Sequence, residues 1–233
     1  MASEKGPSHM DATLGRRIEP WDFVESFEPR ALRKETYLLY ELRWTSGKIW
    51  RNANRNTTQH AEVNFIEKHI SERRIRPSTN CCITWFLSWS PCWECAKVIK
   101  EFLSQHPRVT LVINAARLFY HTDPQNRQGL RDLVASGVTI KIMSMAEYRY
   151  CWEQFVNYPP GEEACCPRYT PEPMMMYALE LQSTILNLPS CLKISKSHQN
   201  QLAFFNLTLQ NCHYEAFYLL ALGLLTAFYP TWR

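Results

Sequence analysis

The sequence predicts a layered α/β domain in which helices cover a β-sheet. Apolar runs of strand length alternate with longer amphipathic stretches along most of the chain, which is the pattern of strand–helix units that share one sheet. Hydrophobic residues make up 45% of the chain, an ordinary share for a protein with a buried core. The length of 233 residues suits one or two domains.

The first expected elements are a short helix and a β-hairpin. Residues 16–27 have the spacing of an amphipathic helix. An apolar, aromatic-rich run at 37–44 precedes a Ser46-Gly47 turn and a second short run at 49–51, so these residues predict a hairpin.

Two helices are expected on either side of a buried strand. Thr58 is expected to cap a helix over 60–70. The apolar run at 82–87 predicts the strand. Ser90 is followed by a proline, which suits the first position of a helix, so a second helix is expected over 90–104.

Strands and helices continue to alternate in the second half of the chain. Strands are expected at 109–115 and 138–143, and helices at 126–135 and 146–156. A last helix, over 174–188, follows a proline-rich break and ends before another proline.

The two ends of the chain differ from this pattern. We expect residues 1–15 to be a flexible N-terminus and residues 16–188 to form the main domain. Residues 189–233 contain short apolar runs and are expected to form a small apolar C-terminal subdomain.

The composition argues against a secreted or membrane-spanning protein. Residues 1–20 lack the apolar core of a secretory signal, and the apolar stretch at 217–229 is shorter than the roughly 20 residues of a membrane span. The nine cysteines are an odd number, so a reducing compartment is expected rather than a disulfide framework. The net charge of +4 permits a nucleic-acid partner without requiring one.

Two short motifs carry candidate metal ligands. His60 lies at the start of one predicted helix, and Cys92 and Cys95 lie at the start of another. Cysteines three apart on a helix face the same way, and a helix N-terminus stabilises thiolate. These three residues would bind zinc through one nitrogen and two sulfurs and would leave the fourth tetrahedral position open, as catalytic zinc sites do.

Glu62 is the candidate for proton transfer, because at a first helical turn its carboxylate can converge with His60 on a metal beyond the helix end. A carboxylate there can take a proton from water and return it to a substrate. Each signal is weak alone, since a lone histidine, a C-x-x-C pair or a glutamate at a helix start is more often structural. The combined pattern H-x-E…P-C-x-x-C is the established signature of zinc deaminases.

The sequence resembles the AID/APOBEC family of polynucleotide cytidine deaminases. Residues 88–92 match the S-W-S-P-C element of the family. The resemblance implies the cytidine deaminase-like fold, which is a five-stranded mixed sheet flanked by about six helices, with zinc between the second and third helices. Similarity to one member covers nearly the whole chain and is carried by residues 17–21, 83–95, 126–133 and 151–160.

The resemblance also implies a function, which is C-to-U editing of messenger RNA together with activity on single-stranded DNA. The implied partners are single-stranded RNA and DNA, an RNA-recognition-motif complementation factor, and a second copy of the chain bound through the C-terminal region. No membrane partner is expected, and the implied location is nucleus and cytoplasm. Residues 165–167 and 215–226 depart from the relative, which bears on partner contacts and dimerisation rather than on the chemistry.

A cytosine must leave its stack to reach the zinc, so the site needs an aromatic side chain that stacks on the base and side chains that bind phosphate. Trp89 is expected to wall the pocket, with core packing as an equal alternative. Phe119 and Tyr120 follow a predicted strand end, where ligand crevices of α/β sheets lie, and they suit stacking on the neighbouring base. The alternative for this pair is a loop anchor, whereas in the family the loop sets the preference for the base before the cytosine.

Residues before the first strand are expected to grip the nucleic-acid backbone. The resemblance implies phosphate and sugar contacts from Arg33, Lys34 and Thr36, and Asn56 could hold the target sugar. The alternative for the basic residues is a solvated loop, and the alternative for Asn56 is a turn residue. The expected substrate contacts are completed by two residues of the metal motifs, Ala61 and Ser90.

Three alternative functions follow from the same residues. One is a single-stranded DNA cytosine deaminase that acts as a mutator or antiviral factor. Another is a structural zinc module that only binds RNA, which needs a fourth protein ligand such as Cys81 or Cys82. The third is a free-nucleoside deaminase, which the basic and aromatic loops disfavour.

Overall fold

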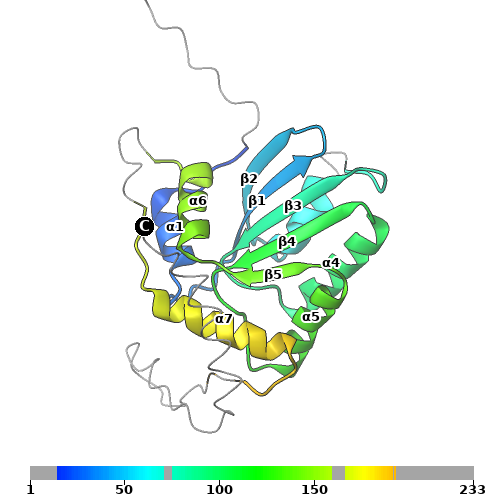
Figure 1. Cartoon of the computed structure of the whole chain (residues 1–233). Coiled ribbons are helices and arrows are strands. Elements are labelled where there is room, and N and C mark those ends of the chain that lie inside the picture. The colour runs from blue at the N-terminus through cyan, green and yellow to red at the C-terminus, as the bar shows by residue number, and fades with distance from the viewer. Residues whose placement is uncertain (1–14, 71–74, 159–165, 191, 193–233) are drawn as a thin grey trace, which may run out of the picture.

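A five-stranded sheet with the strand order β2-β1-β3-β4-β5 forms the centre of the fold (Figure 1). The computed structural model describes residues 15–70, 75–158, 166–190 and 192. The sheet confirms the predicted α/β class and the strand number. Its strands are β1 (Tyr37–Trp44), β2 (Ile49–Arg55), β3 (Cys81–Leu87), β4 (Val109–Ala115) and β5 (Thr139–Ile142).

The sheet is mixed. β1 runs antiparallel to both β2 and β3, whereas β3, β4 and β5 are parallel. The predicted hairpin is confirmed, but β2 continues beyond residue 51 because Arg55 still pairs with Tyr37. Leu87 and Ala115, the last residues of β3 and β4, lie opposite each other. The segments that follow these two strands therefore leave the sheet side by side.

Helices lie at most of the predicted positions. The first predicted helix begins four residues later than expected, and the second changes to π-helical geometry after Asn64. The helices of the described chain are α1 (Pro20–Phe27), α2 (Ala61–Asn64) with the π-helix η1 (Phe65–His69), α4 (Trp93–Gln105), α5 (Pro124–Ala135), α6 (Met145–Phe155) and α7 (Pro171–Ile185).

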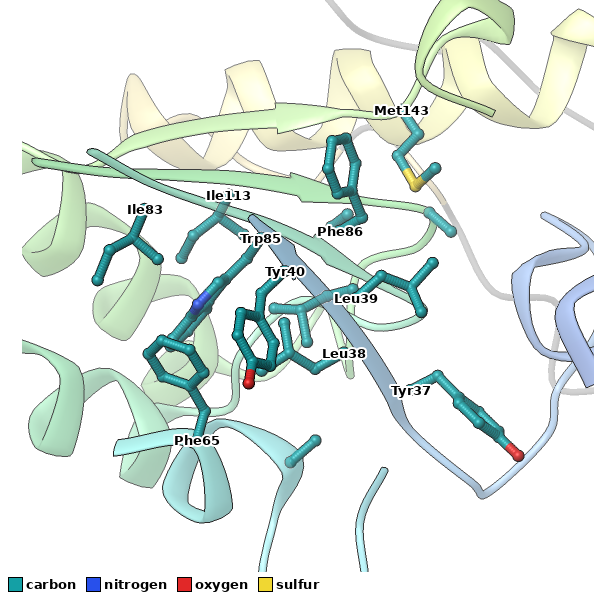
Figure 2. Packing of buried hydrophobic residues seen from close by; sticks show 14 of the residues in the cluster. Tyr37, Leu38, Leu39, Tyr40, Phe65, Ile83, Trp85, Phe86, Ile113 and Met143 are labelled. Carbon is teal, nitrogen blue, oxygen red and sulfur yellow. The ribbon is translucent and has the colours of Figure 1, made fainter. Parts of the chain in front are cut away.

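The helices cover both faces of the sheet. Neighbouring residues of a strand point to opposite faces, and in β3 Trp85 contacts the ring of Phe65 from η1 whereas Phe86 contacts Tyr150 of α6. Figure 2 shows Phe65 against Trp85 and Tyr40, with Phe86 on the other side of the strand. α2 and α6 therefore belong to opposite layers.

Two predicted helix caps are wrong. His60, not Thr58, is the N-cap of α2, since its backbone is still extended at φ −64° and ψ 151°. Cys92, not Ser90, is the N-cap of α4, and its sulfur accepts a hydrogen bond from the Cys95 amide. The hydroxyl of Ser90 instead accepts the amide of Phe119, a long-range contact that local sequence cannot reveal.

The last predicted helix is displaced toward the N-terminus. α7 begins at Pro171, because proline is tolerated in a first helical turn where no amide donor is needed. It ends at Ile185, and Asn187 follows with φ 56°, the left-handed geometry that often terminates a helix.

The expected terminal segments fall largely outside the described part of the chain. The flexible N-terminus at 1–15 is described only at Gly15, and the apolar subdomain at 189–233 only at residues 189, 190 and 192. Among the described helices, none has the length and apolar character needed to cross a membrane.

Candidate metal centre and substrate site

Three candidate ligand atoms meet between the N-termini of α2 and α4. The Nδ1 atom of His60 lies 3.2 Å from the Cys95 sulfur and 3.5 Å from the Cys92 sulfur, and all three ligand atoms lie within 4.8 Å of one another. Tetrahedral zinc with ordinary bond lengths places such nitrogen and sulfur ligands about 3.5 Å apart. One imidazole and two thiols at this spacing fit zinc.

The ligand group has three members among the described residues, which leaves the alternative of a structural four-ligand site unsupported there. Cys81 and Cys82 pair with Val109 and Thr110 at the start of the parallel strands. The metal ligand Cys92 lies beyond the other end of β3. Three ligands are the number that catalytic zinc sites use.

The contact between the two thiols shifts the pKa of each. The hydrogen bond from the Cys95 thiol lowers the pKa of Cys92 to about 5, and the amides of Cys95 and Glu94 act in the same direction. The same thiol pairing, together with burial, raises the pKa of Cys95. Cys92 is therefore the thiol that ionises first, and a sulfur at a helix N-terminus is well suited to remain a thiolate.

Glu62 lies in the first turn of α2 and is almost completely buried. Burial raises the pKa of Glu62 to about 7, and the nearby Cys92 acts in the same direction. The Cys95 thiol and the His60 ring both act to lower the pKa of Glu62, so its carboxyl lies beside the ligand group. A carboxyl with a pKa near neutrality can both accept and release a proton at physiological pH.

Loss of any ligand is expected to lower bound zinc from about one ion per chain to a small fraction, because two remaining protein ligands do not make a stable zinc site. The variants are His60→Ala, Cys92→Ser and Cys95→Ser, and the measurement is metal content by elemental analysis after dialysis. Cys82→Ser, in the half-buried start of β3, is the matched control and should keep its zinc. Zinc loss in that control would instead support a four-ligand site.

Trp89 lies between β3 and the metal ligands and is half-buried. Its indole nitrogen donates a hydrogen bond of 2.9 Å to the carbonyl of Arg33, and the guanidinium carbon of Arg117 lies 4.2 Å from its ring centre. Phe119 meets the same ring edge-on, with the centroids 6.3 Å apart. Trp89 is thus part of an aromatic and cationic cluster at the strand ends.

Tyr120 is the most exposed residue of this cluster, with 70% of its surface accessible. Its ring contacts Phe119 edge-on, with the centroids 4.6 Å apart, and its backbone has φ 36°. A left-handed conformation is uncommon for tyrosine and is found most often where function constrains the backbone. The exposure of Tyr120 is compatible with base stacking, which remains a prediction.

The polar residues expected to grip the backbone lie beside this cluster. Thr36 and Asn56 exchange hydrogen bonds of 2.9 Å, in which the Thr36 amide donates to the Asn56 side chain and the Asn56 amide donates to the Thr36 carbonyl. Arg33 and Lys34 are exposed, and Arg33 forms an ion pair with Glu25. The segment from Arg33 to Thr36 is held at both ends, because Trp89 donates to the Arg33 carbonyl and the Asn56 side chain accepts the Thr36 amide.

The two remaining predicted contacts are buried. Ala61 is fully enclosed, and its carbonyl accepts a hydrogen bond from the Asn54 side chain. Ser90 is buried beside Phe119 and accepts that residue's amide. Ser90 therefore orients the loop that carries the exposed aromatic rings, and contact of either residue with substrate remains a prediction.

Arg117 is a site residue that the sequence analysis missed. Its side chain is fully buried and donates hydrogen bonds to four backbone carbonyls, while burial lowers its pKa to about 10. It thereby joins the segment before β1 to the end of β3. The only sequence signal is a lone arginine in an otherwise apolar strand end. The four carbonyls belong to Ser26, Glu28, Ala31 and Ser88.

The sequence analysis also missed Asn64. It is buried in α2, and its amide nitrogen approaches the Arg55 carbonyl, the Thr57 hydroxyl and the Gln59 carbonyl at 3.2–3.4 Å. These contacts hold the loop that contains Asn56 and leads into His60. A buried asparagine with local partners has no spacing by which sequence alone would reveal it.

A group of three candidate zinc ligands with a buried carboxyl beside it, at the end of this sheet, is characteristic of the zinc-dependent nucleobase deaminases. Comparison with known proteins gives the particular family. A family model described as APOBEC4-like AID/APOBEC deaminase matches residues 26–158. The chain belongs to the AID/APOBEC deaminase family.

Individual relatives match over different lengths. The C→U-editing enzyme APOBEC-1 of Oryctolagus cuniculus is 63% identical over 237 residues, which covers 100% of both chains. The protein of the same name from Homo sapiens is 64% identical and covers 97% of both. The DNA dC→dU-editing enzyme APOBEC-3G of Lagothrix lagotricha is 31% identical over 60% of this chain and 40% of its own.

Proposed function

We propose that this protein hydrolytically deaminates cytidine to uridine in single-stranded polynucleotides, as C-to-U editing of messenger RNA with additional activity on single-stranded DNA. The observation that carries the proposal is the buried Glu62 beside three zinc ligands, in a chain 63% identical over its full length to a C→U-editing enzyme. The relative at 31% identity edits DNA, according to its name, and supports the activity on DNA.

Glu62 performs the proton transfers of the proposed reaction. Zinc held by His60, Cys92 and Cys95 would lower the pKa of a water molecule, so that the water could act as a nucleophile near neutral pH. Glu62 takes a proton from that water and delivers it to N3 of the cytosine ring. As oxygen bonds to C4, Glu62 carries the second proton to the amino group, and ammonia leaves. The reaction consumes one water and replaces the C4 amine by the carbonyl of uracil.

The residues around Trp89 hold the substrate in this proposal. Trp89 forms one wall for the flipped base, and Phe119 with Tyr120 stacks on its neighbour. Arg33, Lys34, Thr36 and Asn56 contact phosphate and sugar at the segment before β1. Such contacts to the backbone bind without reading sequence, so a separate protein is needed to choose a transcript.

The partners and the cellular location belong to the same proposal. We infer that residues 16–188 form the deaminase domain, and that residues 189–233 mediate dimerisation or partner binding. The proposed partner is an RNA-recognition-motif complementation factor, and the proposed location is nucleus and cytoplasm. Light scattering of the full chain, alone and with such a factor, measures both associations, and a monomer that binds no factor contradicts them.

The test of the proposed function is a deamination assay on RNA and DNA strands that contain one cytosine, with and without cell extract. We expect uridine formation on single strands and none on the matched duplexes, because a paired cytosine must first leave the stack. Activity on DNA alone, unchanged by extract, would favour the mutator alternative. Free cytidine that competes as well as the oligonucleotide would identify a nucleoside deaminase instead.

A further inference from the structure

A second ionic cluster lies away from the metal ligands, around Glu180 of α7. Glu180 is fully buried, with 0% of its surface exposed. A buried carboxylate is costly unless it is paired, so its partners define its role. One carboxylate oxygen accepts a hydrogen bond from the guanidinium of Arg127 in α5, and the other accepts the Leu192 amide at 3.1 Å.

The cluster holds the loop that carries the exposed aromatic rings. The Nδ1 atom of His121 lies 3.7 Å from the carboxylate oxygen of Glu180 that faces Arg127. Arg127 also donates a hydrogen bond of 3.3 Å to the carbonyl of His121. The backbone of His121, next to the left-handed Tyr120, is thus held by Arg127, and the His121 ring lies beside the Glu180 carboxylate.

The same cluster holds the chain that leaves α7. The second nitrogen of the Arg127 guanidinium donates to the carbonyl of Leu188, and the Leu192 amide donates to Glu180. The two oxygens of one rigid carboxylate therefore face different segments. The oxygen toward Arg127 and His121 faces the aromatic loop, and the other faces the segment at Leu192.

We propose that Glu180 is a positioning residue that sets the conformation of the loop at 119–123 and thereby the preference for the base beside the target cytosine, and that the segment at Leu188 and Leu192 acts on this preference through the same carboxylate. The inference deepens the proposed function and rests on it. Glu180 does not touch the substrate, and it acts through His121 and Arg127.

The first experiment compares two isosteric changes of buried carboxylates. Glu180→Gln removes the charge of this cluster, and Glu41→Gln removes one whose partners are Arg43, Arg51 and Tyr150 of β1, β2 and α6. Rates are measured on four single strands that differ only in the base before the cytosine. We expect Glu180→Gln to change the ratio of kcat/KM between strands by about threefold or more, and Glu41→Gln to leave the ratio unchanged. If the ratio of kcat/KM between strands is the same in Glu180→Gln as in Glu41→Gln, the inference is wrong.

A second experiment tests whether Glu180 acts through His121. In a His121→Ala background, Glu180→Gln should have a smaller effect on the base preference than in the parent protein, because only the contact through Arg127 remains. Independent, additive effects of the two changes would contradict this route. Arg127→Lys changes the other residue through which Glu180 acts, and it should shift the base preference in the same direction. This variant keeps the inference testable if Glu180→Gln does not fold.

A pair of changes at one position tests the role of the C-terminal segment. Leu192→Pro removes the backbone N–H that donates a hydrogen bond to the Glu180 carboxylate, whereas Leu192→Ala keeps it. We expect only the proline variant to shift the base preference. Identical behaviour of the two variants would rule out coupling through this hydrogen bond.

Hydrogen exchange separates failure of this inference from failure of the proposed function. The Phe119 amide donates to the Ser90 hydroxyl and the Asp123 amide donates to the Tyr120 carbonyl, and both amides are read in one peptide. Their exchange should become faster in Glu180→Gln and stay unchanged in Glu41→Gln, whether or not any strand is deaminated. Unchanged exchange in Glu180→Gln would overturn the positioning role.

Discussion

Replacing Glu62 with glutamine is expected to lower the turnover of cytosine in a single strand by about 1,000-fold, within the range observed when a general acid–base group is lost. The amide has the shape of the carboxyl but cannot take a proton from water or deliver one to the base. Because glutamine leaves His60, Cys92 and Cys95 in place, the zinc content should stay at about one ion per chain.

The measurement is single-turnover deamination of a labelled oligonucleotide, with metal content determined on the same sample. Glu101→Gln, an exposed carboxylate of α4 away from the ligands, is the control and should retain the parent rate. A Glu62→Gln variant that binds zinc and deaminates at the parent rate would show that another group moves the protons.

Replacing Arg117 with methionine is expected to lower the free energy of unfolding by about 3 kcal/mol. The change leaves four backbone carbonyls, two of them buried and two partly buried, without their donor, at roughly 1–3 kcal/mol for each that finds no other partner. Removal of a buried charge offsets part of this loss, since burial of the guanidinium is itself unfavourable. The loss of the contact with Trp89 adds to the effect.

Urea unfolding followed by circular dichroism measures this difference, and Arg108→Met serves as the control. Arg108 is exposed and makes one long contact with the Ser78 carbonyl, so its replacement should change stability by less than about 0.5 kcal/mol. If both variants lose the same small amount, the buried guanidinium does not hold the segment before β1 in solution.

Local sequence predicts elements well where the periodic pattern of side chains decides them. The strand at 109–115 is confirmed at both ends, since its apolar run is bounded by polar residues on one side and by the aromatic loop on the other. The hairpin is confirmed as well, because a Ser46-Gly47 turn joins its strands and Gly47 adopts φ 81°.

Helix ends were predicted less well, because a cap depends on backbone geometry and on competing partners. Ser90 has the residue type of a cap, but its hydroxyl accepts the Phe119 amide from the next strand end. Thr58 precedes an extended His60, so α2 starts one residue later than expected and the histidine, not the threonine, is its N-cap. In both cases a long-range contact or a loop conformation overrides the local preference.

The sequence by itself determined the metal ligands and the candidate acid–base residue, because ligand chemistry requires particular side chains at fixed spacing and two short motifs hold all four. Only the tertiary structure decided how the surrounding loops are held. Arg117 and Glu180 bind groups that lie far away along the chain, many of them backbone carbonyls and amides. Every residue carries such groups, so no sequence pattern distinguishes the ones that a buried charge will bind.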